Sequence, residues 1–292
     1  MGEVRTITSE GFGLGGMLKA ALPVIPGVNQ IPGVKKSGGD LPDLTVRREG
    51  VTVERDHVEA YARVCGFPNK DTVPVTYPHM VAFPLHMALM SDPEFPFPAI
   101  GTVHLENRID QHRAVRVGEV LTAQARAENL RSHAKGRAYD MVVSVESDSE
   151  TVWESTSTYL RVGRGDQENG ERGTEFAEVP AGGITWKLAD DLGRRYAAVS
   201  GDSNPIHLRP ITAKAFGFPR HIAHGMWSKA RAIAAIENRL PEAVRVEVGF
   251  KKPIFLPGRV AFGVRTTATG HEFEISNPKN GAPHVLGRTT AL

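Results

Sequence analysis

An aspartate and a histidine stand five positions apart in the segment Asp202-Ser-Asn-Pro-Ile-His207. Carboxylates and imidazoles are side chains that transfer protons in enzymes. The pair Asn204-Pro205 keeps the segment from continuing as a simple helix, and such a bend can direct both side chains at one water molecule. The pair therefore predicts general acid–base chemistry. The alternative is a turn with Asx-type hydrogen bonds beside a purely structural histidine.

A glycine follows at the predicted start of an apolar helix, in the segment His224-Gly-Met226. The first backbone N–H groups of a helix have no partner within it, and the helix dipole favours negative charge at that end. Gly225 is therefore the predicted donor to an oxyanion that develops during the reaction.

Several nearby residues are predicted to support this centre. Ser200 and Gly201 belong to the same loop, and Asn204 either orients the loop through its side chain or is a simple turn former. Lys251 and Lys252 either contact phosphates or lie at a solvated strand end.

The elements that position these residues occur twice. Tyr61-Ala-Arg-Val-Cys-Gly66 matches Tyr196-Ala-Ala-Val-Ser-Gly201, and each closes a predicted helix, one opening near Asp56 and the other near Ala189. An apolar helical segment follows in each copy, at 78–90 and at 224–236. Strand-like alternation comes next, at 121–127, 139–145 and 152–162 in the first copy and at 244–250 and 260–264 in the second.

This order predicts an α+β fold in which each copy wraps a long antiparallel sheet around a central helix. We expect a Gly- and Pro-rich extended arm at 1–45, a first block at 46–162, a polar linker at 163–180 and a second block at 181–292. The interval from Gly201 to Met226 is 25 positions, 11 more than from Gly66 to Met80, and only the longer one carries the Asp–His pair.

The composition excludes several classes. Hydrophobic residues make up 40% and charged residues 23%, which is typical of a globular protein. A net charge of +2 with scattered basic residues argues against nucleic-acid binding. No window is apolar enough for a membrane span, no signal peptide is evident, and the lone Cys65 permits no intrachain disulfide, so a cytoplasmic location is expected.

Other motifs are weaker. Residues 11–16 fit G-x-G-x-x-G, but no strand precedes them, so we expect no dinucleotide site. His207, His221 and His224 have no carboxylate or cysteine at ligand spacing and are interpreted as surface or loop histidines, with no metal. The remaining interpretations are that Cys65 is a buried, unreactive residue and that four histidines of the first block are ordinary: His79, His86, His104 and His112.

The string from Tyr196 to His207, followed by Ala223-His-Gly-Met226, resembles the signature of the MaoC-like dehydratases and (R)-specific enoyl-CoA hydratases. Phe250-Lys-Lys-Pro-Ile-Phe-Leu-Pro-Gly258 is similar to the next element of that family. The resemblance is strong over 185–292 and weak over 46–162. The two-block layout is similar to double-hotdog members of the family, including actinobacterial 3-hydroxyacyl-thioester dehydratases.

This resemblance implies a tandem hotdog fold and reversible hydration of trans-2-enoyl thioesters to (R)-3-hydroxyacyl thioesters in fatty-acid metabolism. It implies that Asp202 and His207 hold the catalytic water and that Gly225 binds the thioester carbonyl. The substrate would be carried by coenzyme A or an acyl carrier protein, with no metal and no organic cofactor. The protein would be a monomeric pseudo-dimer or a homodimer of double hotdogs.

Two other functions remain open from the sequence: a hotdog acyl-thioesterase and a non-catalytic acyl-binding subunit. The first block lacks a counterpart of Asp202 and His207, so we expect it to shape the acyl pocket. Pro84 is expected to kink or break the first central helix, which would open room for a long acyl chain; the alternative places Pro84 at a helix start.

Overall fold

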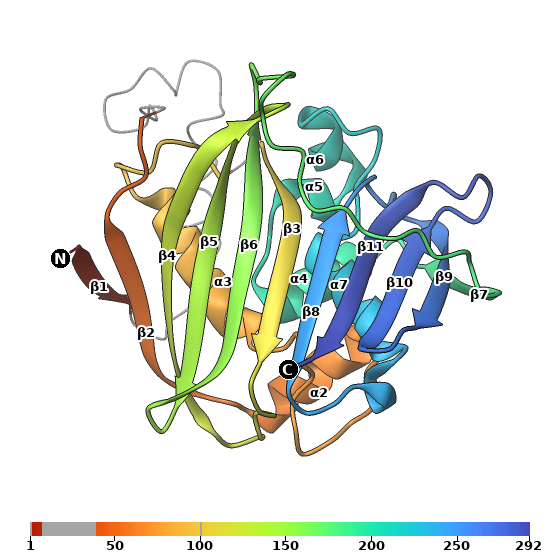
Figure 1. Ribbon diagram of the computed structural model, residues 1–292, viewed down its shortest axis with the longest axis horizontal. Helices are drawn as coiled ribbons and strands as arrows, with labels where there is room; N and C mark the ends of the chain where they lie inside the picture. Colours follow the sequence, from red (N-terminus) through yellow and green to blue (C-terminus); the bar gives the residue numbers. More distant parts are fainter. Residues whose placement is uncertain (1, 8–38, 100) are drawn as a thin grey trace.

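The computed structural model describes residues 2–7, 39–99 and 101–292, and within them a single sheet of 11 strands with the helices gathered on one face (Figure 1). The strand order is β1-β2-β4-β5-β6-β3-β8-β11-β10-β9-β7. The strands are β1 (Glu3–Ile7), β2 (Leu44–Thr52), β3 (Thr102–Gln111), β4 (Val120–His133), β5 (Gly136–Ser147), β6 (Glu150–Val162), β7 (Ile184–Leu188), β8 (Val244–Phe250), β9 (Gly258–Thr266), β10 (Gly270–Ser276) and β11 (Pro283–Ala291). The helices are α2 (Arg55–Cys65), α3 (His79–Ser91), α4 (Leu192–Ser200), α5 (Pro205–Leu208), α6 (Pro210–Ala215) and α7 (Gly225–Ala234), with a 3₁₀ turn η3 (Glu237–Arg239).

The two halves have the same topology. In the first, β2 is followed by α2, α3 and β3 to β6, and the strand order is β2-β4-β5-β6-β3. In the second, β7 is followed by α4, α7 and β8 to β11, and the order read from the opposite edge is β7-β9-β10-β11-β8. The antiparallel pairing of β3 with β8 joins the halves into one sheet. The predicted internal duplication is therefore a structural one.

The helices pack on the same face of this sheet across the pseudo-twofold axis. α2 contacts α4, and the rings of Tyr61 and Tyr196, which are equivalent in the two copies, lie 6.3 Å apart. One hydrophobic cluster extends through both halves, from Val46 on β2 to Val285 on β11. A buried lysine of α7 adds a polar tie, because Lys229 Nζ donates to the backbone carbonyls of Asn107 on β3 and Val246 on β8, at 3.2 and 3.0 Å.

Most predicted elements are present, with shifted ends. α2 begins at Arg55, and α4 begins at Leu192 rather than near Ala189. Both helices end at a glycine with left-handed φ, Gly66 at 84° and Gly201 at 73°. Each glycine relieves the strain that a side chain would meet in that conformation.

The first central helix, α3, runs unbroken from His79 to Ser91 with Pro84 inside it. Of the kink or break expected at Pro84, the break is therefore wrong, and so is the alternative that the helix starts there; a kink stays a prediction. Phe83 and Met87, on either side of the proline, line a cavity.

Two polar segments are more ordered than the sequence suggests. Residues 3–7, expected to be part of an extended arm, form β1, which pairs in parallel with β2. The start of the predicted linker packs on the turn between β4 and β5, where the Glu171 carbonyl accepts from Ala134 N at 3.1 Å. Residues 8–38, including the glycine motif at 11–16, lie outside the described residues. No helix in the part of the chain that the structure describes is long and apolar enough to cross a membrane.

Candidate active site

Backbone hydrogen bonds to side chains hold the loop after α4 in a sharp bend. Ser200 Oγ accepts from the Asp202 N–H at 3.2 Å, and Asp202 Oδ1 accepts from the Asn204 N–H at 3.1 Å. Asn204 Oδ1 in turn accepts from the Ile206 N–H at 3.3 Å and caps the short helix α5, which begins at Pro205. The chain thus changes direction at the Asn204-Pro205 pair, so that Asp202 and His207 face each other.

His207 is a buried residue of α5 whose tautomer is fixed by its neighbour. Its Nδ1 lies 2.8 Å from the Ile222 carbonyl oxygen, and because a carbonyl can only accept, Nδ1 carries the proton. Burial lowers the pKa of His207 to about 3, with a further lowering from His224. The ring is therefore neutral, and its Nε2 has a free lone pair.

Asp202 occupies the opposite side of the bend and keeps part of its side chain exposed to the cavity. Burial raises the pKa of its carboxyl, while His207 and the Asn204 N–H lower it and limit the increase. Asp202 and His207 thus provide a carboxyl group and a neutral imidazole on one surface.

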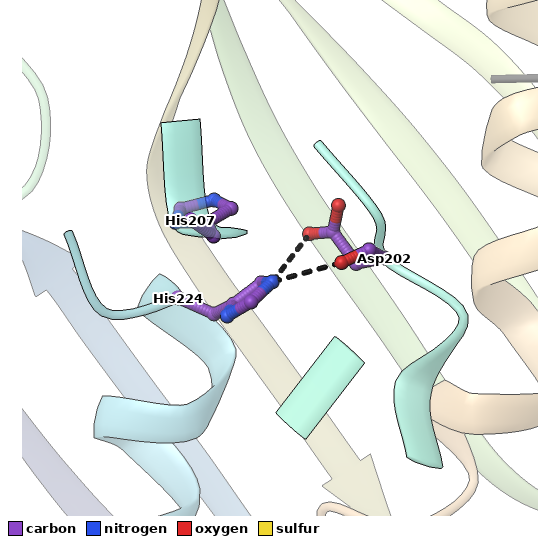
Figure 2. Close-up of side chains that lie close together, drawn as sticks. All are labelled: Asp202, His207 and His224. Atoms are coloured by element: carbon purple, nitrogen blue, oxygen red, sulfur yellow. Dashed lines mark hydrogen bonds and ion pairs between the residues drawn. The ribbon is translucent and has the colours of Figure 1, made fainter. Parts of the chain in front are cut away.

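A second histidine completes the cluster (Figure 2). His224 Nε2 donates to the Asp202 backbone carbonyl at 2.9 Å and lies 3.8 Å from Asp202 Oδ2. Its ring stacks on that of His207, with centroids 3.8 Å apart and planes 27° apart. His207, His221 and His224 are all buried, so the interpretation of these histidines as surface residues is wrong.

The same three side chains are a possible cation-binding group. Ligand atoms of Asp202, His207 and His224 lie within 4.8 Å of one another, so a carboxylate does accompany the histidines, contrary to the sequence-based argument. The ring geometry does not suit a metal ion, however. An imidazole lone pair lies in the ring plane, and an ion about 2.1 Å from one nitrogen of each stacked ring would lie well outside both planes.

Gly225 is the first residue of α7, and its position next to an aromatic ring explains the absence of a side chain. A Cβ on Gly225 would lie 3.2 to 3.3 Å from three ring atoms of Phe250. Glycine therefore lets the start of α7 approach β8 closely. Gly225 and His224 both line the cavity that contains Asp202 and His207.

This cavity has a volume of about 540 Å³ and is built by both halves of the chain. The second half contributes the Asp–His cluster, Tyr196 and, near the mouth, the exposed Lys251 and Lys252. The first half contributes apolar residues of α3 and of the segment after it, including Phe83, Met87 and Met90, together with polar residues that the sequence gave no reason to select: His79, His104 and Tyr159.

Among the residues that sequence reasoning placed here, Ser200 and Asn204 hold the loop, Gly201 ends α4 at the entry to the loop, and Lys251 and Lys252 lie on the cavity wall. The sequence placed His224 in the helix-start motif and in a rejected metal group, and gave it no part in the Asp–His centre. Cys65 is buried as expected, and burial raises the pKa of its thiol to about 12.

Comparison with known proteins gives the same assignment over nearly the whole chain. The family model for the MaoC-like domain matches residues 174–282. The 3-hydroxyacyl-thioester dehydratase X of Mycobacterium tuberculosis is 37% identical over 285 residues, which is 96% of this chain and 98% of the relative. The chain belongs to the MaoC-like dehydratase family. The family resemblance predicted from the motif is confirmed, and it includes the first block, where the motif is weak.

Solved structures agree with this assignment. The crystal structure of the mycobacterial enzyme, HtdX, matches 85% of this chain and all of its own with a TM-score of 0.76 and 38% identity. An (R)-specific enoyl-CoA hydratase of Aeromonas caviae is 35% identical over 77 residues, 25% of this chain and 58% of the relative. A further M. tuberculosis protein, described as a double hotdog fold, matches 83% of this chain and 93% of its own at a TM-score of 0.52 and 12% identity, which bears on the fold alone. The predicted tandem hotdog is therefore confirmed.

Proposed function

We propose that this MaoC-like protein catalyses the reversible addition of water across the 2,3 double bond of an enoyl thioester, giving a 3-hydroxyacyl thioester. The observation that carries the proposal is the meeting of Asp202 and His207 on one cavity wall, with ligand atoms within 4.8 Å, beside the N-terminus of α7.

The protonation states of the pair suit the binding of one water molecule. A neutral His207 with its proton on Nδ1 offers an acceptor at Nε2, and ionised Asp202 offers a carboxylate oxygen. Two acceptors that each lie about 2.8 Å from one water oxygen are about 4.5 Å apart, which falls within the 4.8 Å limit that encloses the ligand atoms of this cluster. Because both hydrogens of that water are then bound, an oxygen lone pair points toward the substrate.

The reaction follows from this arrangement. The water oxygen bonds to C3 while one member of the pair takes its proton, and the electrons of the double bond move toward the thioester oxygen. The free N–H of Gly225 at the start of α7 stabilises the developing oxyanion. Transfer of the held proton to C2 completes the 3-hydroxyacyl thioester and restores the pair, so no metal and no organic cofactor takes part.

The cavity accommodates the rest of the substrate in two directions. Lys251 and Lys252 at its wall are suited to the phosphates of coenzyme A or of a carrier-protein arm. The apolar side chains of α3 in the first block receive the acyl chain, so the first block shapes the acyl pocket as the sequence suggests. We infer the (R) configuration of the product from the similarity to the Aeromonas enzyme, which is named (R)-specific.

Incubation of the purified protein with trans-2-enoyl-CoA of four to sixteen carbons tests this function. We expect loss of the enoyl absorbance, formation of the (R)-3-hydroxyacyl-CoA by chiral chromatography and no release of free thiol. Release of thiol from a saturated acyl-CoA would indicate a thioesterase instead, and binding without turnover would indicate an acyl-binding subunit.

A further inference from the structure

Three histidines, two of them buried and one (His104) partly buried, line or support the acyl side of the cavity, in the block that lacks the Asp–His pair. His79 at the start of α3 and His104 on β3 line the cavity, together with Tyr159 on β6. His86 lies behind them on α3 and is fully buried, and His79 is only 4% exposed. We call these four residues the polar wall.

The polar wall is continuous with the reaction centre. The Phe250 ring, which packs against Gly225, lies 5.0 Å from the His104 ring. His104 stacks on Tyr159 at 4.6 Å, the two residues being partners in the β3–β6 pairing. Tyr159 Oη lies 3.3 Å from His86 Nδ1, and the rings of His86 and His79 are 5.6 Å apart. The wall therefore leads from the helix start that would hold the thioester to the start of α3.

Each histidine of the wall has one nitrogen without a hydrogen-bond partner among the described residues: His79 Nδ1, His86 Nε2 and His104 Nε2. Leaving a buried polar atom without a partner is unfavourable, so such atoms normally meet water or a ligand. A plain hydrocarbon chain would leave unsatisfied the two nitrogens that belong to cavity-lining residues, His79 Nδ1 and His104 Nε2. An apolar residue at each position would serve such a chain better.

The neighbouring charges show what kind of group the wall can bind. Burial lowers the pKa of His104 to about 3 and of His86 to about 4, so both rings are neutral. A hydrogen bond to the backbone of Glu106 favours protonation of His104, so the partner is the carbonyl and the ring donates to it. The unpartnered Nε2 of His104 is then an acceptor. The nearby Lys229 ammonium is already bound by Asn107 and Val246.

We propose that the polar wall selects acyl thioesters that carry a hydroxyl group on the chain beyond C3. A hydroxyl can donate to His104 Nε2 and accept from a neighbouring ring N–H, whereas a ketone can only accept and a carboxylate would meet neutral rings. The proposal rests on the hydratase function proposed above, because that function places the acyl chain along the first block.

Paired substrates test this selectivity. We expect at least one positional isomer of hydroxylated trans-2-decenoyl-CoA to be hydrated with a kcat/KM about tenfold or more above that of the plain compound, and also above that of the oxo analogue, which can only accept a hydrogen bond. Equal rates for all three would overturn the proposal, since ordered water would then satisfy the wall in every complex. A preference for the oxo compound would overturn it as well.

Single-residue variants test whether the preference for hydroxylated substrates arises at the polar wall. His104→Phe keeps a flat ring against Tyr159 but removes the acceptor, so the ratio of hydroxylated to plain kcat/KM should fall to about one. His112→Phe, at an exposed histidine just after the same strand, should keep the wild-type ratio. Because the readout is a ratio on one protein, partial loss of folded enzyme cancels. Retention of the preference in folded His104→Phe, and in His79→Leu, would contradict the assignment.

A binding measurement separates this proposal from the proposed reaction. Calorimetric titration with saturated hydroxydecanoyl-CoA and decanoyl-CoA compares affinities without turnover. Tighter binding of the hydroxylated compound with no hydration of any enoyl-CoA would support the proposed selectivity of the polar wall and refute the proposed hydratase function. Hydration of plain decenoyl-CoA with equal affinity for both saturated compounds would support the hydratase function and refute the selectivity.

Discussion

Asp202 and His207 have complementary chemical roles because their local hydrogen bonds differ. The Ile222 carbonyl fixes the proton of His207 on Nδ1, whereas the Asp202 carboxylate receives a single backbone N–H, from Asn204. A water between them donates one hydrogen bond to each of these acceptors, so its oxygen can act only as a nucleophile.

Substitution of either residue should stop turnover. We expect Asp202→Asn and His207→Gln each to lower kcat by about 10²- to 10⁴-fold. The double variant should be scarcely worse than the worse single variant, because the pair acts on one water. Steady-state kinetics on crotonyl-CoA check this, and wild-type turnover in either single variant would remove that residue from the mechanism.

The two variants should differ in stability. Asp202→Asn lies in a polar loop at the cavity and should leave the melting temperature nearly unchanged. His207 is buried and donates to Ile222, so His207→Gln should lose about 1 kcal/mol in the free energy of unfolding. Chemical denaturation measures both. The sequence suggests no such difference, because it shows only a polar loop around both residues.

The pH dependence of kcat/KM follows from the burial of the pair. The active form needs ionised Asp202 and neutral His207. Burial raises the pKa of Asp202 above its ordinary value and lowers that of His207 to about 3. Activity should therefore fall with decreasing pH through the Asp202 pKa, above the ordinary range of an aspartate. An acid limb at the ordinary pKa of an exposed aspartate would contradict the raised pKa of Asp202.

The sequence could reveal the residues that belong to a local motif and not those that meet only in the fold. Asp202, Asn204 and His207 lie within six positions, so their pattern is visible in the chain. His104 and Tyr159 lie 55 positions apart and become neighbours only through the β3–β6 pairing. His224 was read as a helix-start residue because its stacking on His207 depends on the bend at Asn204.

At the scale of elements, α3 supplies the acyl side of the cavity. Met87 is buried against Phe83 and Ala99 and lines the cavity. Met87→Trp should fill this region, so the ratio of kcat/KM for dodecenoyl-CoA to that for crotonyl-CoA should fall about tenfold or more. Initial rates with both substrates measure the ratio, and an unchanged ratio would place the acyl chain elsewhere.

Element prediction succeeded where periodicity is regular. Strand β8 coincides with the alternating run from Val244 to Phe250, and α2 ends at its predicted glycine. Strand β3 was missed because the exposure of its residues does not alternate along the strand. One of its faces borders the cavity, and its two edges are hydrogen-bonded to β6 and to β8. The break expected at Pro84 did not occur, because α3 packs along β2 and β4 and this tertiary contact outweighs the local cost of one proline.

The whole molecule should lose stability in mild acid. Burial lowers the native pKa of several buried histidines, four of which lie at or behind the cavity wall: His79, His86, His207 and His224. In the unfolded chain each binds a proton below about pH 6.5, and in the native protein it does not, so the unfolding free energy decreases as pH falls. Each should contribute about 1 kcal/mol of loss between pH 7 and 5.5. The raised pKa of Asp202 acts in the opposite direction.

Denaturant unfolding at pH 7 and 5.5 measures this loss. Replacing His86, which lies behind the cavity wall, removes one of the four titrating groups. His86→Phe should therefore show a smaller loss over the same interval, by about 1 kcal/mol. The exposed His112 offers a matched control, and His112→Phe should keep the wild-type loss. A stability independent of pH over this range would show that these rings are not neutral in the native protein.

The pseudo-symmetry of the molecule allows two sites, and its sequence asymmetry leaves one. α3 and α7 are equivalent central helices, but α3 begins with His79 where α7 begins with Gly225. The connection from Gly66 to α3 is short and has no counterpart of α5, which carries His207. Within the described residues, the second-half group is also the one in which ligand atoms of three histidine or carboxylate side chains lie within 4.8 Å of one another.

We therefore expect titration with a tight, unreactive substrate analogue to give one site per chain. The halves should also depend on each other, because β8 pairs with β3 and Lys229 of α7 bonds to Asn107 of β3. A fragment of residues 175–292 alone would expose this edge strand and leave the lysine with half of its partners. A stoichiometry of two, or full activity of that fragment on long-chain substrates, would show that the first half has kept a site or is dispensable. The expected single site instead means that duplication released one half from catalysis, and that half now determines which acyl chains the Asp202–His207 pair can reach.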